Sequence, residues 1–516
     1  MRPGTRAEAA ALIDAARPLF VDDPDALAVL DDLTRRLDEP LRLAIAGIVK
    51  AGKSTLLNAL LGERIAPTDA GECTRIVTWY RWSDTPSITA HLRSGPVRRL
   101  PVRRDNGMLV IGLGDLPADQ VDRIEVGWPS AVLRSFTLID TPGIASLSHD
   151  VSARSAAFLV PDDAPSAADA IIYLMRHLHP TDLGFLEAFR DTAAGAARTV
   201  NAVAVLSRAD EVGSGRIDSL LSAGKVAARY EREGGLGSLV LAVLPVAGLL
   251  AEGARTLRQG EFNAFRTLAT LDRRERERLL VSSDRFVRPD APVGLSEGTR
   301  RQLLARFGIY GVRLATSLLR VGVADSSELS TGLVEQSGLN HLELFVEQQF
   351  GARVDTLKAR AVTDTLERLL GRLAAADRGE ETLTRLERVQ ASAHDLRELA
   401  LLSQLRLGAS PFEAPDAAAA ARIVGGRGTG TWQRLGLPVD ADRAALQEAT
   451  VAELDRWRAR SLSPLAERVQ REACAVVLRS LEVVASHLGA ATPDEAPTDV
   501  VAPGRPGERR AEAAGQ

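Results

Sequence analysis

The chain has 516 residues, of which 45% are hydrophobic and 4% aromatic, and its formal net charge at pH 7 is −4. Its length predicts two or three domains rather than one. Its balanced charge excludes the global basic field that attracts nucleic acid, so we expect no nucleic-acid partner. The two cysteines, Cys73 and Cys474, form neither a disulfide framework nor the spacing of a zinc site.

Residues 5–38 carry apolar side chains at helical spacing, which predicts N-terminal helices over 1–38. The run LRLAIA at 41–46 is typical of a strand, and strand and helix signals then alternate to about residue 335. The clear strands in this alternation are RIVTWYRW, FTLID, AIIYLM, VNAVAVLS and LVLAVLPV. Alternating strands and helices predict an α/β domain over 39–337, with a mostly parallel sheet flanked by helices.

From Gly338 onward the chain carries helical patterns. An all-α bundle over 338–491, which the N-terminal helices join, is predicted from three such runs, at about 339–369, 383–399 and 440–488. The stretch at 410–438 between the second and third runs is rich in turn residues, and we expect loops there. The tail at 492–516 is rich in Pro, Ala and charged residues, and we expect it to be disordered.

The stretch GIVKAGKST at 47–55 matches the pattern G-x-x-x-x-G-K-[ST] without a gap. It follows a predicted strand and precedes the helical pattern STLLNALLG, which is the context that a phosphate-binding loop requires; a chance glycine-rich turn is the alternative. In such a loop backbone N–H groups surround the phosphates, Lys53 reaches the β- and γ-phosphates, and the Ser54 hydroxyl ligates magnesium. The nucleotide-binding residues predicted here are Gly47, Lys50, Ala51, Gly52, Lys53, Ser54 and Thr55.

The sequence Asp140-Thr-Pro-Gly143 ends the strand FTLID. An Asp at this place holds magnesium through water, and the Gly143 amide can bond the γ-phosphate, as in the switch of a GTPase. Thr74 precedes the strand RIVTWYRW and is the candidate switch threonine, which completes the magnesium site and holds the attacking water; Thr68 is its competitor. The predicted ligands of Mg²⁺ are Ser54, Thr74 and Asp140.

The sequence Ser207-Arg-Ala-Asp210 ends the strand VNAVAVLS and is similar to the [NT]-K-x-D sequence of GTPases. The Asp of that sequence accepts two hydrogen bonds that guanine donates and adenine cannot. Arg208 keeps a long stem to lie along the base, whereas Ser207 replaces the Asn that supports the loop, and a surface turn is the alternative. Val246 and Ala247 follow the next strand, where a final loop can offer a backbone N–H to guanine.

The ordered set GIVKAGKSTLLNALLG, APTDAGECTRIVTW, LIDTPG and LSRADEVGSGRIDSLL, followed by a helical region, resembles the bacterial dynamin-like GTPases. It is most similar to the isoniazid-inducible set of actinobacteria, in particular its shorter C member, over about residues 5–490. The resemblance implies a dynamin-like GTPase domain with a helical neck and trunk, and GTP and GDP as ligands. It also implies homodimerisation through the GTPase domains, work on membranes, and a paralogous partner.

The short helical region departs from the longer family members, whose extended trunk ends in a lipid-binding tip. Two stretches are candidates for lipid contact here: Arg422–Leu437, which contains Trp432, and the basic cluster around Trp457. An ordinary connector and a solvated helix face are the respective alternatives. No run approaches 18 apolar residues, so we expect a cytoplasmic protein, or one peripheral to the inner face of the cell membrane.

Lys50 stands out because the chain has only four lysines, at 50, 53, 225 and 358. The resemblance implies that a monovalent cation near this position neutralises charge in the transition state, held by a Ser or Asn. We hypothesise that the Lys50 ammonium replaces that ion, and therefore count Lys50, Lys53 and Thr74 as catalytic. The alternative is that Lys50 points to solvent or to a ground-state phosphate.

Two classes of function follow from these patterns. The first is a dynamin-like GTPase that acts on or stabilises membranes through nucleotide-dependent dimerisation. The second is a soluble regulatory or assembly GTPase, or a GTP-binding subunit of a paralogous dynamin-like protein, without direct lipid contact. Direct lipid binding is the property that separates them.

Overall fold

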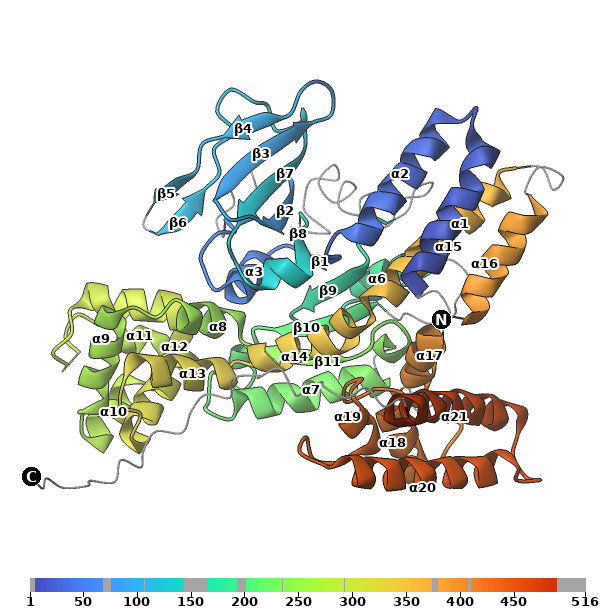
Figure 1. Cartoon of the computed structure of the whole chain (residues 1–516). Helices are drawn as coiled ribbons and strands as arrows, with labels where there is room; N and C mark the ends of the chain where they lie inside the picture. Colours follow the sequence, from blue (N-terminus) through green and yellow to red (C-terminus); the bar gives the residue numbers. More distant parts are fainter. Residues whose placement is uncertain are drawn as a thin grey trace, which may run out of the picture.

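A nine-stranded sheet forms the centre of the molecule (Figure 1). The structure, a computed structural model, describes residues 5–67, 76–105, 107–142, 166–192, 201–233, 235–291, 293–373, 379–392, 394–406 and 410–489. The strand order is β11-β10-β9-β1-β8-β2-β7-β3-β4. The strands are β1 Leu41–Gly47, β2 Val77–Trp82, β3 Ser87–Leu92, β4 Arg98–Leu100, β7 Val121–Trp128, β8 Phe136–Asp140, β9 Ala170–Met175, β10 Ala202–Ser207 and β11 Val243–Val246.

The part of the sheet that carries the predicted motifs is parallel. β1 pairs in parallel with β8 and β9, and β9, β10 and β11 continue the parallel pairing. β2 runs antiparallel to β8, and β3 runs antiparallel to both β4 and β7. The predicted fold class, an α/β domain with a mostly parallel sheet, is confirmed. The antiparallel extension, with a separate ribbon of β5 Arg103–Asp105 and β6 Met108–Val110, was not expected.

Helices cover both faces of the sheet, because successive side chains of a strand point to opposite faces. In β1, Leu43 and Ile45 belong to one apolar core and Ala44 and Ala46 to another. The first core includes residues of α3 Lys53–Leu61, α4 Val132–Ser135 and α14 Leu339–Gln349. The second includes residues of α6 Pro180–Thr192 and α7 Ser219–Glu233.

The expected alternation of strands and helices ends earlier than the sequence suggested. β11 begins at Val243 rather than Leu239, because the amides of Leu239 and Val240 both donate to the Leu236 carbonyl in a 3₁₀ turn, η4 Leu236–Ser238. From there to α13 the chain forms helices within its described part. They are α8 Gly248–Arg255, α9 Gln259–Ala269, α10 Arg273–Leu279, α11 Ser283–Phe286, α12 Glu297–Val321 and α13 Ser326–Glu335.

The remaining helices form two separate apolar clusters (Figure 1). The first joins the N-terminal helices to two helices from residues 354–392: α1 Thr5–Ala16, η1 Arg17–Phe20, α2 Pro24–Asp38, α15 Val354–Gly371 and α16 Glu380–Ser392. The second contains α17 His394–Arg406, α18 Ala414–Ile423, α19 Thr431–Leu435, α20 Arg443–Ser461 and α21 Arg468–Gly489. We call them the N-terminal bundle and the C-terminal bundle.

The stretch at 410–438, expected to be loops, contains the two short helices α18 and α19. It packs inside the C-terminal bundle: Arg434 pairs with the buried Glu398, and Arg422 pairs with Glu453. The alanine run in this stretch has a high intrinsic helix propensity. The loop prediction gave more weight to the surrounding glycines and prolines.

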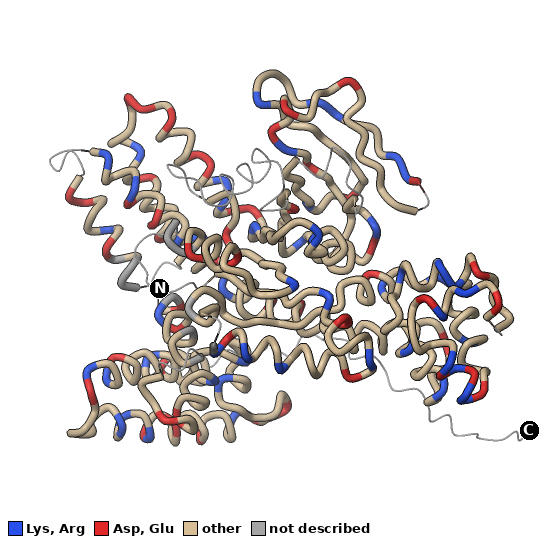
Figure 2. The backbone as a smooth tube through the Cα atoms, turned by 180° about the vertical axis from the view of Figure 1, so that it is seen from behind, with Lys and Arg blue, Asp and Glu red and all other residues tan. Residues whose placement is uncertain are grey.

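Trp457, in the other lipid-contact candidate, is fully buried in the C-terminal bundle and so is not available to lipid. Arg456 and Arg458 beside it are 45% and 58% exposed, and Arg456 lies over the Trp457 ring, which agrees with the alternative of a solvated helix face with Trp stacked on Arg. Within the described residues no helix is long and apolar enough to cross a bilayer. Figure 2 shows basic and acidic residues interspersed along the helices of both bundles.

Candidate functional site

The phosphate-binding loop connects β1 to α3 in a conformation that the sequence dictates. Gly47 has φ 143°, and a Cβ there would lie 2.2 Å from the carbonyl oxygen of Leu174 on β9, so no side chain fits. Gly52, with φ 97°, precedes the first residue of α3, Lys53. The N-terminus of a helix then points its free N–H groups and positive dipole at the loop, which is the arrangement that binds phosphate.

Lys53, Ser54 and Asp140 meet where β1 and β8 end. The Lys53 ammonium donates to the carbonyls of Gly47 at 3.0 Å and Ile48 at 3.2 Å, and the Ser54 hydroxyl lies 3.2 Å from Asp140 Oδ2. Burial lowers the pKa of Lys53, while the charge of Asp140 opposes that shift. Burial also raises the pKa of Asp140 to about 6, against the opposing effects of Lys53 and Ser54.

The side-chain oxygens of Ser54 and Asp140 are ligands of the kind that Mg²⁺ takes. No group of three or more His, Cys, Asp or Glu residues that could hold a metal occurs among the described residues. A hydroxyl and a carboxylate beside a phosphate-binding loop suit Mg²⁺, which takes few protein ligands and completes its octahedron with water and substrate phosphates. These two residues fit the predicted magnesium site.

The second predicted loop, Ser207–Asp210, follows the end of β10. The Ser207 hydroxyl donates to the Met175 carbonyl at 3.0 Å, so this serine supports the loop that the usual asparagine would hold. Arg208 has φ 52°, and its guanidinium pairs with Glu211 at 2.8 Å. Asp210 is half-buried, and burial raises the pKa of its carboxylate. A desolvated carboxylate favours N–H donors such as those of guanine.

A cavity of about 160 Å³ joins the two loops. Its lining includes Ala51, Gly52, Thr55, Ser207, Arg208, Asp210 and Val246, so it brings half of the predicted nucleotide-binding residues together. The Ala247 amide is not free, because it donates to the Ser337 carbonyl at 2.8 Å. Gly248 lines the cavity instead and begins α8. Gly248 ends the loop Pro245–Gly248 that the sequence indicated, although only Val246 and Ala247 were counted as binding residues, and Leu249 was missed.

Lys50 lies at the crest of the phosphate-binding loop, exposed and with φ 64°. It makes no hydrogen bond or ion pair with the part of the chain that the structure describes. A left-handed conformation is unusual for a residue other than glycine, and such strain concentrates at functional sites.

The candidate switch threonine Thr74, the alternative Thr68, and Gly143 lie outside the described residues, as does the tail at 492–516.

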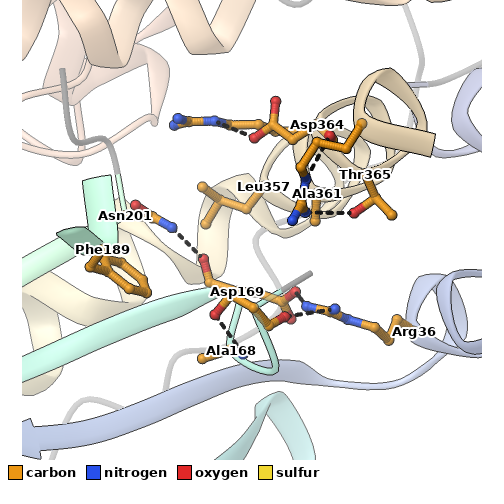
Figure 3. Close-up of a pocket in the computed structure, with 12 residues that line it drawn as sticks. Arg36, Ala168, Asp169, Phe189, Asn201, Leu357, Ala361, Asp364 and Thr365 are labelled. Carbon is orange, nitrogen blue, oxygen red and sulfur yellow. Dashed lines mark hydrogen bonds and ion pairs between the residues drawn. The ribbon is translucent and has the colours of Figure 1, made fainter. Parts of the chain in front are cut away.

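A second, smaller cavity of about 40 Å³ lies between β9, α2 and α15 (Figure 3). Arg36 of α2 pairs with Asp169 at 2.6 Å, and the two side chains are 4% and 1% exposed. Asp364 of α15 lies across this cavity beside Arg360 (Figure 3). Burial raises the pKa of Asp364 to about 6, despite the charge of Arg360. Nothing in the local sequence around Arg36 or Asp169 indicates this pairing.

The fold and the loops at one edge of its sheet define a P-loop GTPase. A model of the dynamin family matches residues 43–182. The isoniazid-induced protein IniC of Mycobacterium tuberculosis is 41% identical over 473 residues, which cover 92% of this chain and 95% of that protein. The chain therefore belongs to the family of bacterial dynamin-like proteins that includes IniC.

Two further likenesses cover the chain differently. The isoniazid-induced protein IniA of Mycobacterium tuberculosis is 33% identical over 152 residues, or 25% of this chain and 23% of that protein. A solved structure of an oligomerised bacterial dynamin pair covers 95% of this chain and 75% of that chain, with 12% identity and a TM-score of 0.35.

Proposed function

We propose that this dynamin-family GTPase uses Mg²⁺ and nucleotide-dependent dimerisation to act on or stabilise membranes. The observation that carries the nucleotide part is the cavity that joins Gly52 to Asp210. When nucleotide binds, the Lys53 ammonium exchanges its hydrogen bonds to the carbonyls of Gly47 and Ile48 for the β- and γ-phosphates, which its flexible side chain allows. Bound Mg²⁺ neutralises phosphate charge there. Ser54 and Asp140 hold it, and Asp210 accepts the guanine N–H groups.

We assign Lys50 the role of a built-in monovalent cation. Its ammonium is unengaged by described residues, exposed, and carried on the strained crest of the loop. Groups that neutralise developing charge in comparable sites contribute about 3–4 kcal/mol. Hydrolysis by the wild type is therefore expected to be equally fast in sodium and potassium.

The Lys50 assignment is tested by turnover of Lys50→Ser in sodium and in potassium. We expect slower hydrolysis, by roughly 100- to 1,000-fold if the full electrostatic contribution is lost, and a new dependence on the cation. Lys225→Ser, which removes an exposed lysine of α7, is the matched control and should hydrolyse GTP normally. Equal rates for wild type and Lys50→Ser would refute the assignment.

The turn between α20 and α21 is the surface we propose for lipid contact, at the outer end of that hairpin (Figure 1). Leu462 and Leu465 are 81% and 91% exposed, whereas Trp432, the candidate from the sequence, is 37% exposed. Arg458 and Arg468 flank the two leucines and are also exposed. An apolar tip between basic side chains suits the interface of a membrane that contains anionic lipids.

The membrane proposal is tested by sedimenting anionic liposomes with the full chain while measuring GTP hydrolysis. We expect co-sedimentation with faster turnover, and at least about tenfold weaker binding for Leu462→Ser/Leu465→Ser, since a buried leucine contributes roughly 1.5–3 kcal/mol. Val439→Ser removes a side chain that is 72% exposed in the same bundle and is the matched control. Turnover without sedimentation would favour a partner subunit that does not contact lipid.

We call the loop that begins at Ser207 and carries Asp210 the base-reading loop. We assign the dimer contact to the face of the GTPase domain beside this loop. Ile217 and Leu221 are 58% and 75% exposed there and line one groove with Val281, which is 57% exposed. Exposed apolar side chains grouped in one groove suit a second copy of the chain. Light scattering should show a dimer with a GTP analogue and a monomer with GDP, and Leu221→Glu should remove the dimer. A monomer in every nucleotide state would contradict this contact.

A further inference from the structure

The loop that follows Asp210 is held by one arginine from a helix about a hundred residues further along the chain. Arg313 of α12 donates from Nη1 to the Gly215 carbonyl at 2.5 Å and to the Ser214 carbonyl at 3.3 Å. The same guanidinium donates to the carbonyls of Leu280 at 2.8 Å and Val281 at 2.9 Å. It therefore links the base-reading loop to the end of α10 through backbone oxygens.

The backbone of the loop is shaped to offer those oxygens. Gly213, Ser214 and Gly215 have φ of 75°, 64° and 68°, a left-handed run that includes one residue with a side chain. A Cβ at Gly215 would lie 3.1 Å from Ile309 of α12, so the loop and the helix are in close contact. Such a conformation costs free energy and persists where surrounding contacts hold it. The four bonds of Arg313 are such contacts.

The support from Arg313 extends back to Asp210 along the loop. The amide of Ser214 donates to the Glu211 carbonyl at 3.1 Å, and the amide of Glu211 donates to the Arg208 carbonyl at 2.9 Å. These bonds connect the carbonyls that Arg313 holds to the residues on both sides of Asp210. A displacement of Ser214 and Gly215 would therefore move the carboxylate.

α12 also approaches Asp210 directly, at a break in the helix. Gly308 has φ 63° and ψ 172°, a conformation that only glycine adopts readily, and it divides α12 into two segments. A Cβ at Gly308 would lie 3.6 Å from Asp210 Oδ2. Burial, followed by the charge of Asp210, raises the pKa of Tyr310, the second residue of the new segment, to about 12. The restarted helix thus packs beside the carboxylate.

We infer that Arg313 is a positioning residue for guanine recognition, which fixes the loop that carries Asp210 from the side of α12. The inference rests on the base-reading role proposed above for Asp210. Guanine donates two hydrogen bonds to a correctly placed carboxylate, and hypoxanthine, which lacks the 2-amino group, donates one. A loop that is free to shift loses most of that difference, because both hydrogen bonds require one orientation of the carboxylate.

The test is the ratio of the equilibrium affinities of the full chain for GDP and IDP, measured by calorimetry without membranes. Arg313→Ala is expected to reduce the preference for GDP by about tenfold, the factor that one hydrogen bond to a charged group contributes. Arg313→Lys should recover part of it, because an ammonium can still reach two carbonyls. Arg320→Ala is the matched control: it lies on the same helix and donates to the Ala269 carbonyl at 3.1 Å, away from the loop.

A ratio is chosen because partial unfolding lowers both affinities equally and leaves their ratio unchanged. An unchanged ratio for Arg313→Ala, together with a reduced ratio for Asp210→Asn, would overturn the role of Arg313 alone. An unchanged ratio for both variants would overturn the base-reading role of Asp210 as well. A reduced ratio for Arg313→Ala and a normal ratio for Arg320→Ala would support the inference.

Discussion

The buried ion pair between Arg36 and Asp169 provides a sharp test of the energetics at the base of the sheet (Figure 3). Arg36→Met retains most of the side-chain volume and leaves the Asp169 carboxyl with its backbone donor at Arg42, 2.8 Å away. Breaking a buried pair by removing one partner costs about 3–5 kcal/mol. The lost bond to the Ser166 carbonyl, 3.0 Å from Arg36, increases that cost. Entry of water into the adjacent cavity decreases it, so we expect about 3 kcal/mol.

The assay is urea denaturation followed by circular dichroism, and the midpoint should fall by up to about 1 M, because m is large for a chain of this length. Arg273→Met is the matched control, because Arg273 and Glu277 are 2.8 Å apart, against 2.6 Å for Arg36 and Asp169, but are 81% and 60% exposed. The control should change stability by less than about 0.5 kcal/mol. A double-mutant cycle with Asp169→Asn should give a coupling of at least about 2 kcal/mol. If both arginine variants lost equally little stability, burial would not control the strength of this pair.

Three further changes have defined outcomes. Gly47→Ala should abolish GDP binding in calorimetry, because its Cβ would lie 2.2 Å from the Leu174 carbonyl oxygen. Gly260→Ala in α9, with no left-handed φ and nothing within 4 Å, should bind normally. The folded state raises the pKa of Asp364 from 3.8 to about 6, so the folded protein binds this proton more tightly than the unfolded chain does. The free energy of unfolding should therefore fall by about 1–3 kcal/mol as pH rises from 4 to 6. Asp364→Asn should reduce that fall. Although burial alone would raise it, hydrogen bonds from His394, Arg434 and Ser480 lower the pKa of Glu398 from 4.5 to about 2. The stability that this carboxylate contributes should be complete above pH 4.5 and lost as pH falls through 2, and denaturation of Glu398→Gln should lack that loss.

The phosphate-binding loop could be predicted from the sequence because its residues act through their own backbone. Gly47 and Gly52 adopt the positive φ that the pattern requires, and the apolar run before them forms β1. The strands with apolar runs, from β8 to β10, follow from their composition for the same reason. Ser207 was read as a weakness of its loop, yet its hydroxyl reaches Met175, on the neighbouring strand. That partner is visible only once β9 and β10 are side by side.

The parts that could not be predicted depend on contacts between distant segments. Arg36 and Asp169 are separated by 133 positions, and each alone reads as an ordinary surface charge. Trp432 became a candidate for lipid contact, with an ordinary connector as the alternative, because tryptophan in a glycine-rich loop is conspicuous. The packing of the C-terminal bundle leaves Leu462 and Leu465 far more exposed than Trp432. Exposure is a property of the assembled helices, which local composition does not contain.

The N-terminal bundle has a consequence for how the chain matures during synthesis. The ammonium of Lys358 donates to the Leu37 carbonyl, 321 positions earlier, and Leu12 and Leu33 pack on Leu366 in the same apolar cluster. At about 5–20 residues per second, translation needs roughly 15–60 s to add the intervening chain. Helices as short as α1 and α2 are marginal alone. The growing polypeptide therefore leaves the ribosome with an unburied apolar segment in front and a GTPase domain folding behind it, which makes that segment a natural place for a chaperone to bind.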